Sequence, residues 1–338
     1  MKVAISGAGI TGAYLFRMLE NQGCEVHLYD RRKNTGCGLT PCAWGTSTAF
    51  IELVSNAGLD GNKYILQRLD HLQMDEIRVR AELLTIDKPR LIKDLLRGTR
   101  PHLAPLPFAD YDRVIDATGV ARALLPPVAD DLVLNCRQEL VQSDQALPNR
   151  IKLGGIGYAW CFPLDDNRYH IGCGNLLHDP GQFLEQLGWI DHPSATGTGR
   201  VLCRCDGRIR LTGPHLSQPF VTRRFETEIW GIGEAIGCVA PLAGDGIVPG
   251  LRSVQLLLAA WHDPTQYRQA VLDEFHWMWE ERAIIERLRQ GQGVGLRQAR
   301  VLRKNSQRMG MTVGLRHAIT LLRRMGNAAG SRVCGSGG

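Results

Sequence analysis

Six consecutive residues near the N-terminus have the types and spacing of a phosphate-binding loop: Gly7, Ala8, Gly9, Ile10, Thr11 and Gly12. They follow the apolar run Lys2–Ser6 and precede a stretch, residues 13–21, with helical spacing of its apolar side chains. In such a loop Gly7 permits a tight turn, Gly9 lets a pyrophosphate approach bare backbone at the helix N-terminus, and Gly12 lets helix pack on strand. The loop predicts a dinucleotide site; the alternative is a tight strand-to-helix turn that binds nothing.

A second strand, Glu25–Asp30, follows this helix and ends at an acid, at the spacing that the dinucleotide fingerprint requires. Asp30 could accept hydrogen bonds from ribose hydroxyls, whereas Arg31 and Arg32 could face a 2′-phosphate. The N-terminal unit by itself therefore leaves the identity of the nucleotide open.

Two further glycine-bearing segments lie far along the chain. The first is Asp112–Gly119, a buried-strand pattern that ends in Ala117, Thr118 and Gly119. The second begins at Gly233 and Glu234 and continues through Pro241 to the string Gly244, Asp245, Gly246 and Ile247. Together with the glycine loop, these segments resemble the motifs of the FAD-dependent reductases and hydroxylases of the glutathione-reductase-like type. The resemblance implies that the cofactor is FAD.

The same resemblance implies roles for individual residues. In that family an acid in the position of Glu234, usually Asp, binds the flavin ribityl chain; Glu keeps the acceptor on a longer side chain. The helix that begins near Gly246 would place its N-terminus at the pyrimidine edge of the ring, where the helix dipole favours the anionic reduced flavin. The family's arginine before its crossover helix, a pyrophosphate contact, corresponds here to Lys88 or Arg90.

Aromatic residues alternate in the segment Gly157–Pro163. Because alternate side chains of a strand lie on one face, Tyr158, Trp160 and Phe162 would form an aromatic wall suited to apolar, polarisable groups. With Pro163, this string resembles the YxWxFP motif of the geranylgeranyl reductases, where it lines a cavity for a polyprenyl chain. The resemblance makes these four residues candidate substrate contacts in a short member of that family; the alternative is an ordinary aromatic core strand.

A cysteine-bearing loop, Gly36–Gly45, lies between the acid of the second strand and the following helix. Resembling reductases have such a loop beside the flavin ring, and Cys42 is the better positional match of its two cysteines. A thiol there could donate the proton that completes alkene reduction, or tune the ring. Cys42 is therefore the candidate catalytic residue, and a buried structural cysteine is the alternative.

The remaining elements follow from hydrophobic spacing and turn residues. We expect a helical crossover over Ile51–Asp75, a strand over Glu76–Ile86, short antiparallel strands over Asp131–Phe225 and helices after Pro264. The predicted fold class is α/β: a doubly wound FAD-binding domain, an inserted and mostly antiparallel substrate domain, and a helical C-terminus. The boundaries are residues 1–125 and 226–262 for the first, 126–225 for the second and 263–338 for the basic C-terminal region.

Composition and charge bear on membrane spans, metal sites and charged partners. No apolar run is long enough to span a bilayer and no leader precedes the first strand, so a cytoplasmic protein is expected. The ten cysteines have no metal-ligand spacing, which predicts no metal site. After Glu286 the chain carries eleven Lys and Arg and no acid. This basic region is either a solvated helix face or a surface for an anionic membrane, and it has no nucleic-acid-binding motif.

Three functions remain open at this stage. The first, implied by the resemblance, is an FAD-dependent reductase that saturates double bonds of an isoprenoid lipid or quinone chain. Because no second dinucleotide loop is present, its electrons would come from an external donor, a ferredoxin or transient NAD(P)H. The second is a flavin monooxygenase or halogenase-like enzyme on a smaller aromatic substrate. The third is an FAD- and lipid-binding protein without turnover.

Overall fold

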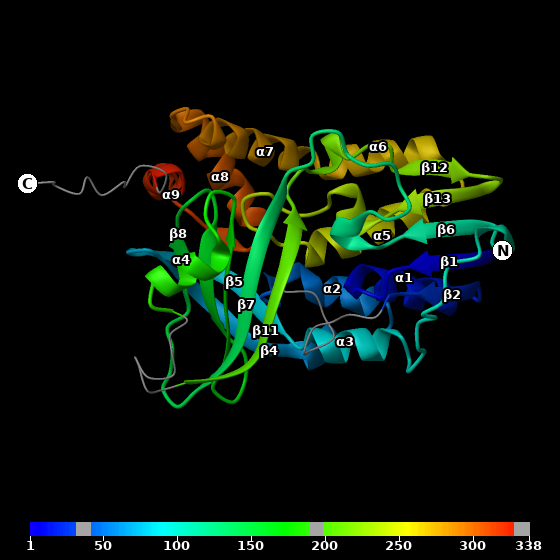
Figure 1. Ribbon diagram of the computed structural model, residues 1–338, viewed down its shortest axis with the longest axis horizontal. Helices are drawn as coiled ribbons and strands as arrows, with labels where there is room; N and C mark the ends of the chain where they lie inside the picture. Colours follow the sequence, from blue (N-terminus) through cyan, green and yellow to red (C-terminus); the bar gives the residue numbers. More distant parts are fainter. Residues whose placement is uncertain (32–41, 190–198, 328–338) are drawn as a thin grey trace, which may run out of the picture.

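The computed structural model describes residues 1–31, 42–189 and 199–327, and contains two sheets with helices on both sides (Figure 1). The first sheet has the strand order β12-β13-β6-β1-β2. All neighbours in it are parallel except β12 and β13. The strands are β1 (Lys2–Ser6), β2 (Glu25–Tyr29), β6 (Arg113–Asp116), β12 (Val221–Arg224) and β13 (Thr227–Gly231).

Helices cover this first sheet because its central strands are apolar on both faces. Val3, Ala4 and Ile5 of β1 and Val114 and Ile115 of β6 are fully buried, as expected for parallel strands between helices. The helices around it are α1 (Ile10–Asn21), α2 (Ala49–Asn56), α3 (Lys88–Leu95) and α5 (Ile247–Ala259). Short 3-10 turns are η1 (Gly61–Tyr64), η2 (Phe108–Asp110), η3 (Gly119–Ala121), η4 (Pro214–Leu216) and η5 (Gly233–Ile236).

The second sheet is larger and mostly antiparallel, with the order β11-β7-β10-β9-β8-β4-β5-β14 and β3 paired to β5. Only the β4–β8 pair in it is parallel, within the described residues. Its strands are β3 (Gly45–Ser47), β4 (Ile65–Met74), β5 (Ile77–Ile86), β7 (Val133–Ser143), β8 (Arg150–Leu153), β9 (Tyr158–Pro163), β10 (Arg168–Asn175), β11 (Gly199–Arg210) and β14 (Met311–Thr312). The short helix α4 (Pro180–Gln186) follows β10.

The helical crossover expected over Ile51–Asp75 is wrong for its second half. Helix α2 ends at Asn56, and β4 occupies Ile65–Met74 as the antiparallel partner of β5. Two irregularities in the β4–β5 register, at Ile65/Gln67 and Leu69/His71, break the alternation of buried residues. The apolar spacing therefore imitates a helix, while pairing with β5 decides the conformation.

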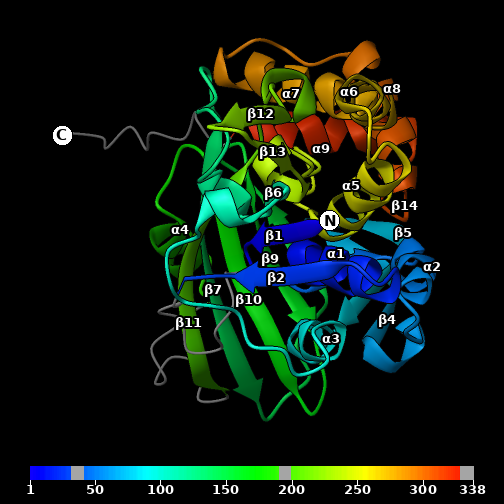
Figure 2. The ribbon, with the colours of Figure 1, turned by 90° about the vertical axis from the view of Figure 1, so that its right-hand side faces the viewer.

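The second sheet takes strands from both sides of the proposed boundary at residues 125 and 126, since β4 and β5 precede it. The three-part division of the chain stays a prediction. The expected C-terminal helices are present as α6 (Pro264–Glu274), α7 (His276–Arg289), α8 (Leu296–Arg308) and α9 (Leu315–Asn327). In Figure 2 they gather on one side of the molecule, beside α5. Residues 328–338, the end of the predicted basic region, lie outside the described residues.

The C-terminal helices complete a second hydrophobic core. Ile284, Leu288, Ala299, Leu321 and Met325 pack in one cluster with apolar side chains of β4, β5, β8 and β9. In the described ranges, no helix is long and apolar enough to cross a membrane.

Candidate functional site

The glycine loop connects β1 to α1, and its three glycines do different things. Gly7 has φ +111°, and a Cβ there would lie 2.2 Å from the Ala117 carbonyl oxygen. A Cβ on Gly12 would lie 2.0 Å from the Gly7 oxygen, whereas one on Gly9 would meet nothing within 4 Å. Gly9 is the N-cap of α1, and no side chain caps that helix. Gly7 and Gly12 are thus required by packing, while Gly9 leaves open space at a helix N-terminus that is suited to an anion.

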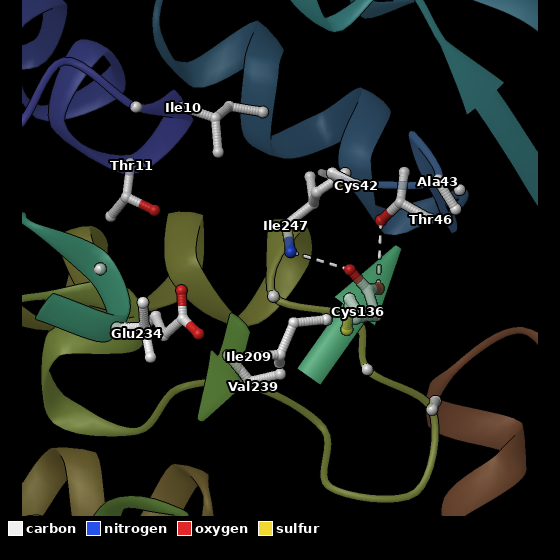
Figure 3. Close-up of a pocket in the computed structure, with 18 of the residues that line it drawn as sticks. Ile10, Thr11, Cys42, Ala43, Thr46, Cys136, Ile209, Glu234, Val239 and Ile247 are labelled. Carbon is white, nitrogen blue, oxygen red and sulfur yellow. Dashed lines mark hydrogen bonds between the residues drawn. The ribbon is translucent and has the colours of Figure 1, made fainter. Parts of the chain in front are cut away.

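That space belongs to one continuous cavity of about 680 Å³, which extends from the glycine loop to the C-terminal helices. Figure 3 shows part of it, with Ile10 and Thr11 of the loop facing Ile247 and Glu234. Most of the predicted cofactor residues line it: Gly7, Ala8, Gly9, Ile10, Thr11, Asp30, Arg31, Lys88, Thr118, Gly119, Glu234, Gly244, Asp245, Gly246 and Ile247. Gly12 instead packs against Gly7 and Ala117, and Arg32 lies outside the described residues.

A lysine supplies positive charge to the cavity. Lys88 is the first residue of α3, is only 8% exposed and lines the cavity. Its ammonium group makes no hydrogen bond or ion pair with any residue that the structure describes, and its charge lowers the pKa values of Glu234 and Asp245. Arg90, the other candidate, points elsewhere: its Nη1 donates to the Lys63 carbonyl at 3.3 Å and its guanidinium lies over the Tyr64 ring. Of the two basic residues, Lys88 is therefore the one that could contact a bound anion.

Two acids also line the cavity, Glu234 and Asp245. Glu234 Oε1 accepts from the Arg210 backbone N–H at 2.8 Å, and burial raises its pKa. Asp245 accepts from the Ile247 N–H at 2.8 Å and from the Thr46 hydroxyl at 3.2 Å, the dashed lines in Figure 3. Burial raises the pKa of Asp245 to about 6. Because Asp245 lies just before α5, it fixes the loop from which that helix begins.

Cys42 lies on the cavity wall beside Ala43 and Thr46 (Figure 3). The part of its predicted loop before it, from Gly36 to Pro41, falls outside the described residues. Cys42 thus shares the cavity with the glycine loop, as its candidate catalytic role requires.

The aromatic residues of β9 face the same cavity. Tyr158, Trp160 and Phe162 line it, while the intervening Ala159 and Cys161 pack in a separate cluster on the other side of the sheet. The Tyr158 hydroxyl donates to the Ala243 carbonyl in the loop before α5. Trp160 and Phe162 line the cavity and are also buried in the second core. Their position is therefore compatible with both the predicted substrate wall and the alternative of a core strand.

Glycine at position 172 makes room for the largest of these rings. Gly172 of β10 pairs with Trp160, and a Cβ on it would lie 2.3 Å from the indole. The indole Nε1 has no hydrogen-bond partner among the residues described. Pro163, the fourth predicted substrate contact, does not line the cavity; its carbonyl accepts from the Thr85 hydroxyl at 2.9 Å.

Several cavity residues have no counterpart in the sequence-based prediction. They come from β4, β5 and the last helices: Leu69, Leu72, Met74, Leu83, Glu281, Leu302, Ser306, Met309, Leu321, Leu322 and Met325. The β4 residues were missed because that segment resembled a helix. The C-terminal ones were missed because the prediction gave helices and a basic charge there, without a packing partner for their apolar side chains. The apolar stripe of α9 was the available signal.

The described residues contain no group of three or more His, Cys, Asp or Glu side chains that could hold a metal ion.

Comparison with known proteins places the fold. No family model matches the chain. It is 24% identical to an uncharacterized protein of Methanocaldococcus jannaschii over 304 aligned residues, 76% of this chain and 82% of the relative. Among solved structures, it resembles a geranylgeranyl bacteriochlorophyll reductase-like protein of Thermoplasma acidophilum. That match has a TM-score of 0.66 and 15% identity, and covers 84% of this chain and 87% of the other.

Two other similar structures have the names of enzymes that catalyse different reactions. A p-nitrophenol 4-monooxygenase of Pseudomonas putida matches with a TM-score of 0.62 and 12% identity over 98% of this chain and 99% of its own. A tryptophan 6-halogenase of Streptomyces toxytricini matches with a TM-score of 0.61 and 13% identity over 84% and 78%.

This chain has the fold of the FAD-dependent oxidoreductases. The predicted fold class and the resemblance to the geranylgeranyl reductases are confirmed at the level of the fold. The neighbours also support the prediction of an FAD-dependent enzyme. The open Gly9 backbone, the Lys88 ammonium and the acid Glu234 provide a fitting set of partners for the pyrophosphate and ribityl parts of FAD.

Proposed function

We propose that this chain is an FAD-dependent reductase that saturates carbon–carbon double bonds of a polyprenyl lipid or quinone chain. The observation that carries the proposal is that one cavity joins the glycine loop to a chamber with apolar walls. A flavin on the loop side would therefore have its substrate face directed at hydrocarbon side chains.

The cofactor end has a residue for each part of FAD. The Gly9 backbone at the start of α1 and the Lys88 ammonium would bind the pyrophosphate, and Asp30 the adenosine ribose. Glu234 would accept from the ribityl hydroxyls, and the start of α5 after Gly246 would face the flavin ring. When bound, FAD supplies the hydride chemistry; the protein binds and orients it.

The substrate end suits an isoprenoid chain. Leucine, methionine and aromatic side chains from β4, β9, α8 and α9 surround it, and they exclude water without imposing directional hydrogen bonds. Cys42 lines this cavity, which is compatible with a catalytic role. That role stays a prediction, and Cys42→Ser tests it.

One observation favours a second candidate, a monooxygenase or halogenase-like enzyme on a small aromatic substrate. The Trp160 ring lines the chamber, its buried Nε1 has no hydrogen-bond partner among the described residues, and two similar structures have names of that kind. A flavin- and lipid-binding protein without turnover is the third candidate.

We further propose an anionic membrane surface as a partner. Leu302 of α8, Met309 just after α8 and Leu322 of α9 line the chamber, and the two helices carry exposed basic residues. These residues are Arg297, Arg300, Arg303, Lys304, Arg308, Arg316 and Arg323. A lipid substrate could then pass from the membrane into the chamber beneath these helices. The external electron donor, a ferredoxin or NAD(P)H, and the cytoplasmic placement stay predictions.

Anaerobic photoreduction of the FAD-loaded protein tests the function. Addition of a polyprenyl alcohol without oxygen should reoxidise the flavin and yield an acceptor heavier by two hydrogens per bond reduced. Reoxidation that needs oxygen and a small aromatic compound would favour the second candidate. No acceptor-dependent reoxidation under either condition would favour the third.

A further inference from the structure

One carboxyl group, that of Glu281, lies in the otherwise apolar wall of the chamber. Glu281 of α7 lines the cavity but is only 2% exposed. Its Oε2 accepts from the Leu242 backbone N–H at 3.1 Å. Leu242 lies three residues before Asp245, in the loop that leads to the start of α5. Glu281 is therefore attached to the loop that would carry the flavin ring, and it faces the chamber.

Desolvation shifts this carboxyl toward its protonated form, so that a substantial fraction carries the proton near neutral pH. The pKa of Glu281 is raised to about 7, chiefly by burial and slightly by the charge of neighbouring Glu280, against the lowering effect of the Leu242 N–H and the Asn305 amide on α8. In the described ranges no cation forms an ion pair with Glu281: Arg282 pairs with Glu286, and His215 and His276 of the adjoining η4 and α7 contact each other. The acid form is thus the one that the surroundings stabilise.

The other protic groups on the chamber walls are poorer acids or already engaged. The Tyr158 hydroxyl donates to the Ala243 carbonyl, and burial raises its pKa. The Ser306 hydroxyl donates to the Arg303 carbonyl in its own helix at 3.0 Å. Burial also raises the pKa of the Cys136 thiol.

Asp245 also lines the cavity with a pKa of about 6, but it accepts hydrogen bonds from both the Ile247 N–H and the Thr46 hydroxyl, and Glu234 accepts from the Arg210 N–H at the proposed ribityl position. Glu281 is the cavity acid that lies among the apolar side chains of the C-terminal helices, with an acidity near physiological pH.

We propose that Glu281 is the side chain that delivers a proton to the substrate when its double bond is reduced. This inference rests on the proposed reductase function. In the step, the carbon–carbon π bond breaks, one carbon receives a hydride from the reduced cofactor, and its neighbour receives the proton of Glu281. Two C–H bonds form, the cofactor is oxidised by two electrons, and Glu281 remains as a carboxylate that regains its proton from solvent.

A purely structural role would also explain the Leu242 hydrogen bond. Glu281→Gln separates the two roles, because an amide oxygen still accepts from that N–H but the side chain cannot give up a proton to carbon. Glu280→Gln is the matched control: it removes the preceding carboxyl of the same helix, which does not line the cavity. Cys42→Ser tests the alternative donor.

The measurement is the single-turnover rate at which a polyprenyl alcohol reoxidises the photoreduced, FAD-loaded protein between pH 5.5 and 8.5. The wild-type rate should fall as pH rises through about 7, because Glu281 loses its proton. Glu281→Gln should slow the reaction by roughly 100-fold at pH 6 and abolish this pH dependence. Glu280→Gln should keep the wild-type rate at low pH and the pH dependence, with the fall shifted toward lower pH because the Glu280 charge raises the pKa of Glu281.

Three results would overturn the proposal. One is a wild-type rate that is flat from pH 5.5 to 8.5. Another is a Glu281→Gln variant that keeps the wild-type rate and pH profile while Cys42→Ser loses the rate and the profile. If Glu281→Gln fails to bind FAD, Glu281→Asp must keep the pH-dependent profile at a lower rate, and a flat profile in it would count against the proposal. Failure of the proposed function is distinct, since the wild type would then show no reoxidation by the alkene.

Discussion

Replacing Gly9 by valine should strongly weaken flavin binding and leave the fold intact. A Cβ at Gly9 meets no protein atom within 4 Å, and its φ of −71° and ψ of 179° are open to any residue. The loss of a glycine's freedom in the unfolded chain and the poorer N-cap residue each change the free energy of unfolding by about 1 kcal/mol or less, with opposite signs. The apoprotein should therefore unfold within a few degrees of wild-type apoprotein.

The cost to flavin binding is much larger. The branched side chain would fill the space in which a pyrophosphate contacts the start of α1. Two charge-assisted hydrogen bonds lost there, at about 1.5–3 kcal/mol each, amount to roughly 3–6 kcal/mol. The FAD dissociation constant should rise by roughly 100-fold to 10,000-fold.

Two other glycine variants serve as controls. Gly12→Ala should prevent folding, because its Cβ would lie 2.0 Å from the Gly7 oxygen, whereas Gly293→Val, at an exposed glycine with equally open surroundings, should keep both fold and FAD. The assay is FAD content by absorbance after purification, fluorescence titration of apoprotein with FAD, and thermal unfolding. Full yellow colour in Gly9→Val would refute the assignment of the glycine loop to the cofactor.

Three further predictions follow from the cavity and its surface. Trp160→Ala should lower the free energy of unfolding by about 3 kcal/mol, the low end for a buried Trp, because the space it leaves joins an existing cavity. It should also weaken polyprenyl binding at least tenfold without loss of FAD. Thermal unfolding and single-turnover assays test this, and normal turnover by the folded fraction would contradict a substrate contact. The folded-state pKa values of Asp245, about 6, and Glu281, about 7, lie above their unfolded values. The folded protein therefore holds more protons between about pH 4 and 7, so the free energy of unfolding should fall as pH rises through this window, and thermal unfolding of Glu281→Gln should show a shallower fall. Co-sedimentation with anionic vesicles should drop steeply with salt, and replacing Arg300, Arg303 and Lys304 by alanine should weaken it by about 1 kcal/mol per side chain; equal binding to neutral vesicles would contradict the membrane proposal.

The glycine loop could be predicted from the sequence because its geometry is local. Gly7, Gly9 and Gly12 lie within one strand-to-helix turn, where backbone sterics alone decide which residues fit. Alternation along a strand is equally local, so the common face of Tyr158, Trp160 and Phe162 followed from their spacing. The β4 strand did not, because its two register irregularities removed the alternation on which the prediction depends.

Choices between side chains far apart in the chain needed the tertiary structure. Lys88 and Arg90 are two residues apart and equally basic, and only the packing of α3 turns Lys88 into the cavity and Arg90 onto Tyr64. Glu281 carries no sequence motif; its importance comes from a hydrogen bond to Leu242 and from the apolar side chains that desolvate it. The sequence by itself determined the glycine loop and the aromatic strand, since these depend on short-range backbone geometry. Only the tertiary structure decided which acid, which lysine and which helices enclose the chamber, because burial and pKa arise from residues that meet through folding.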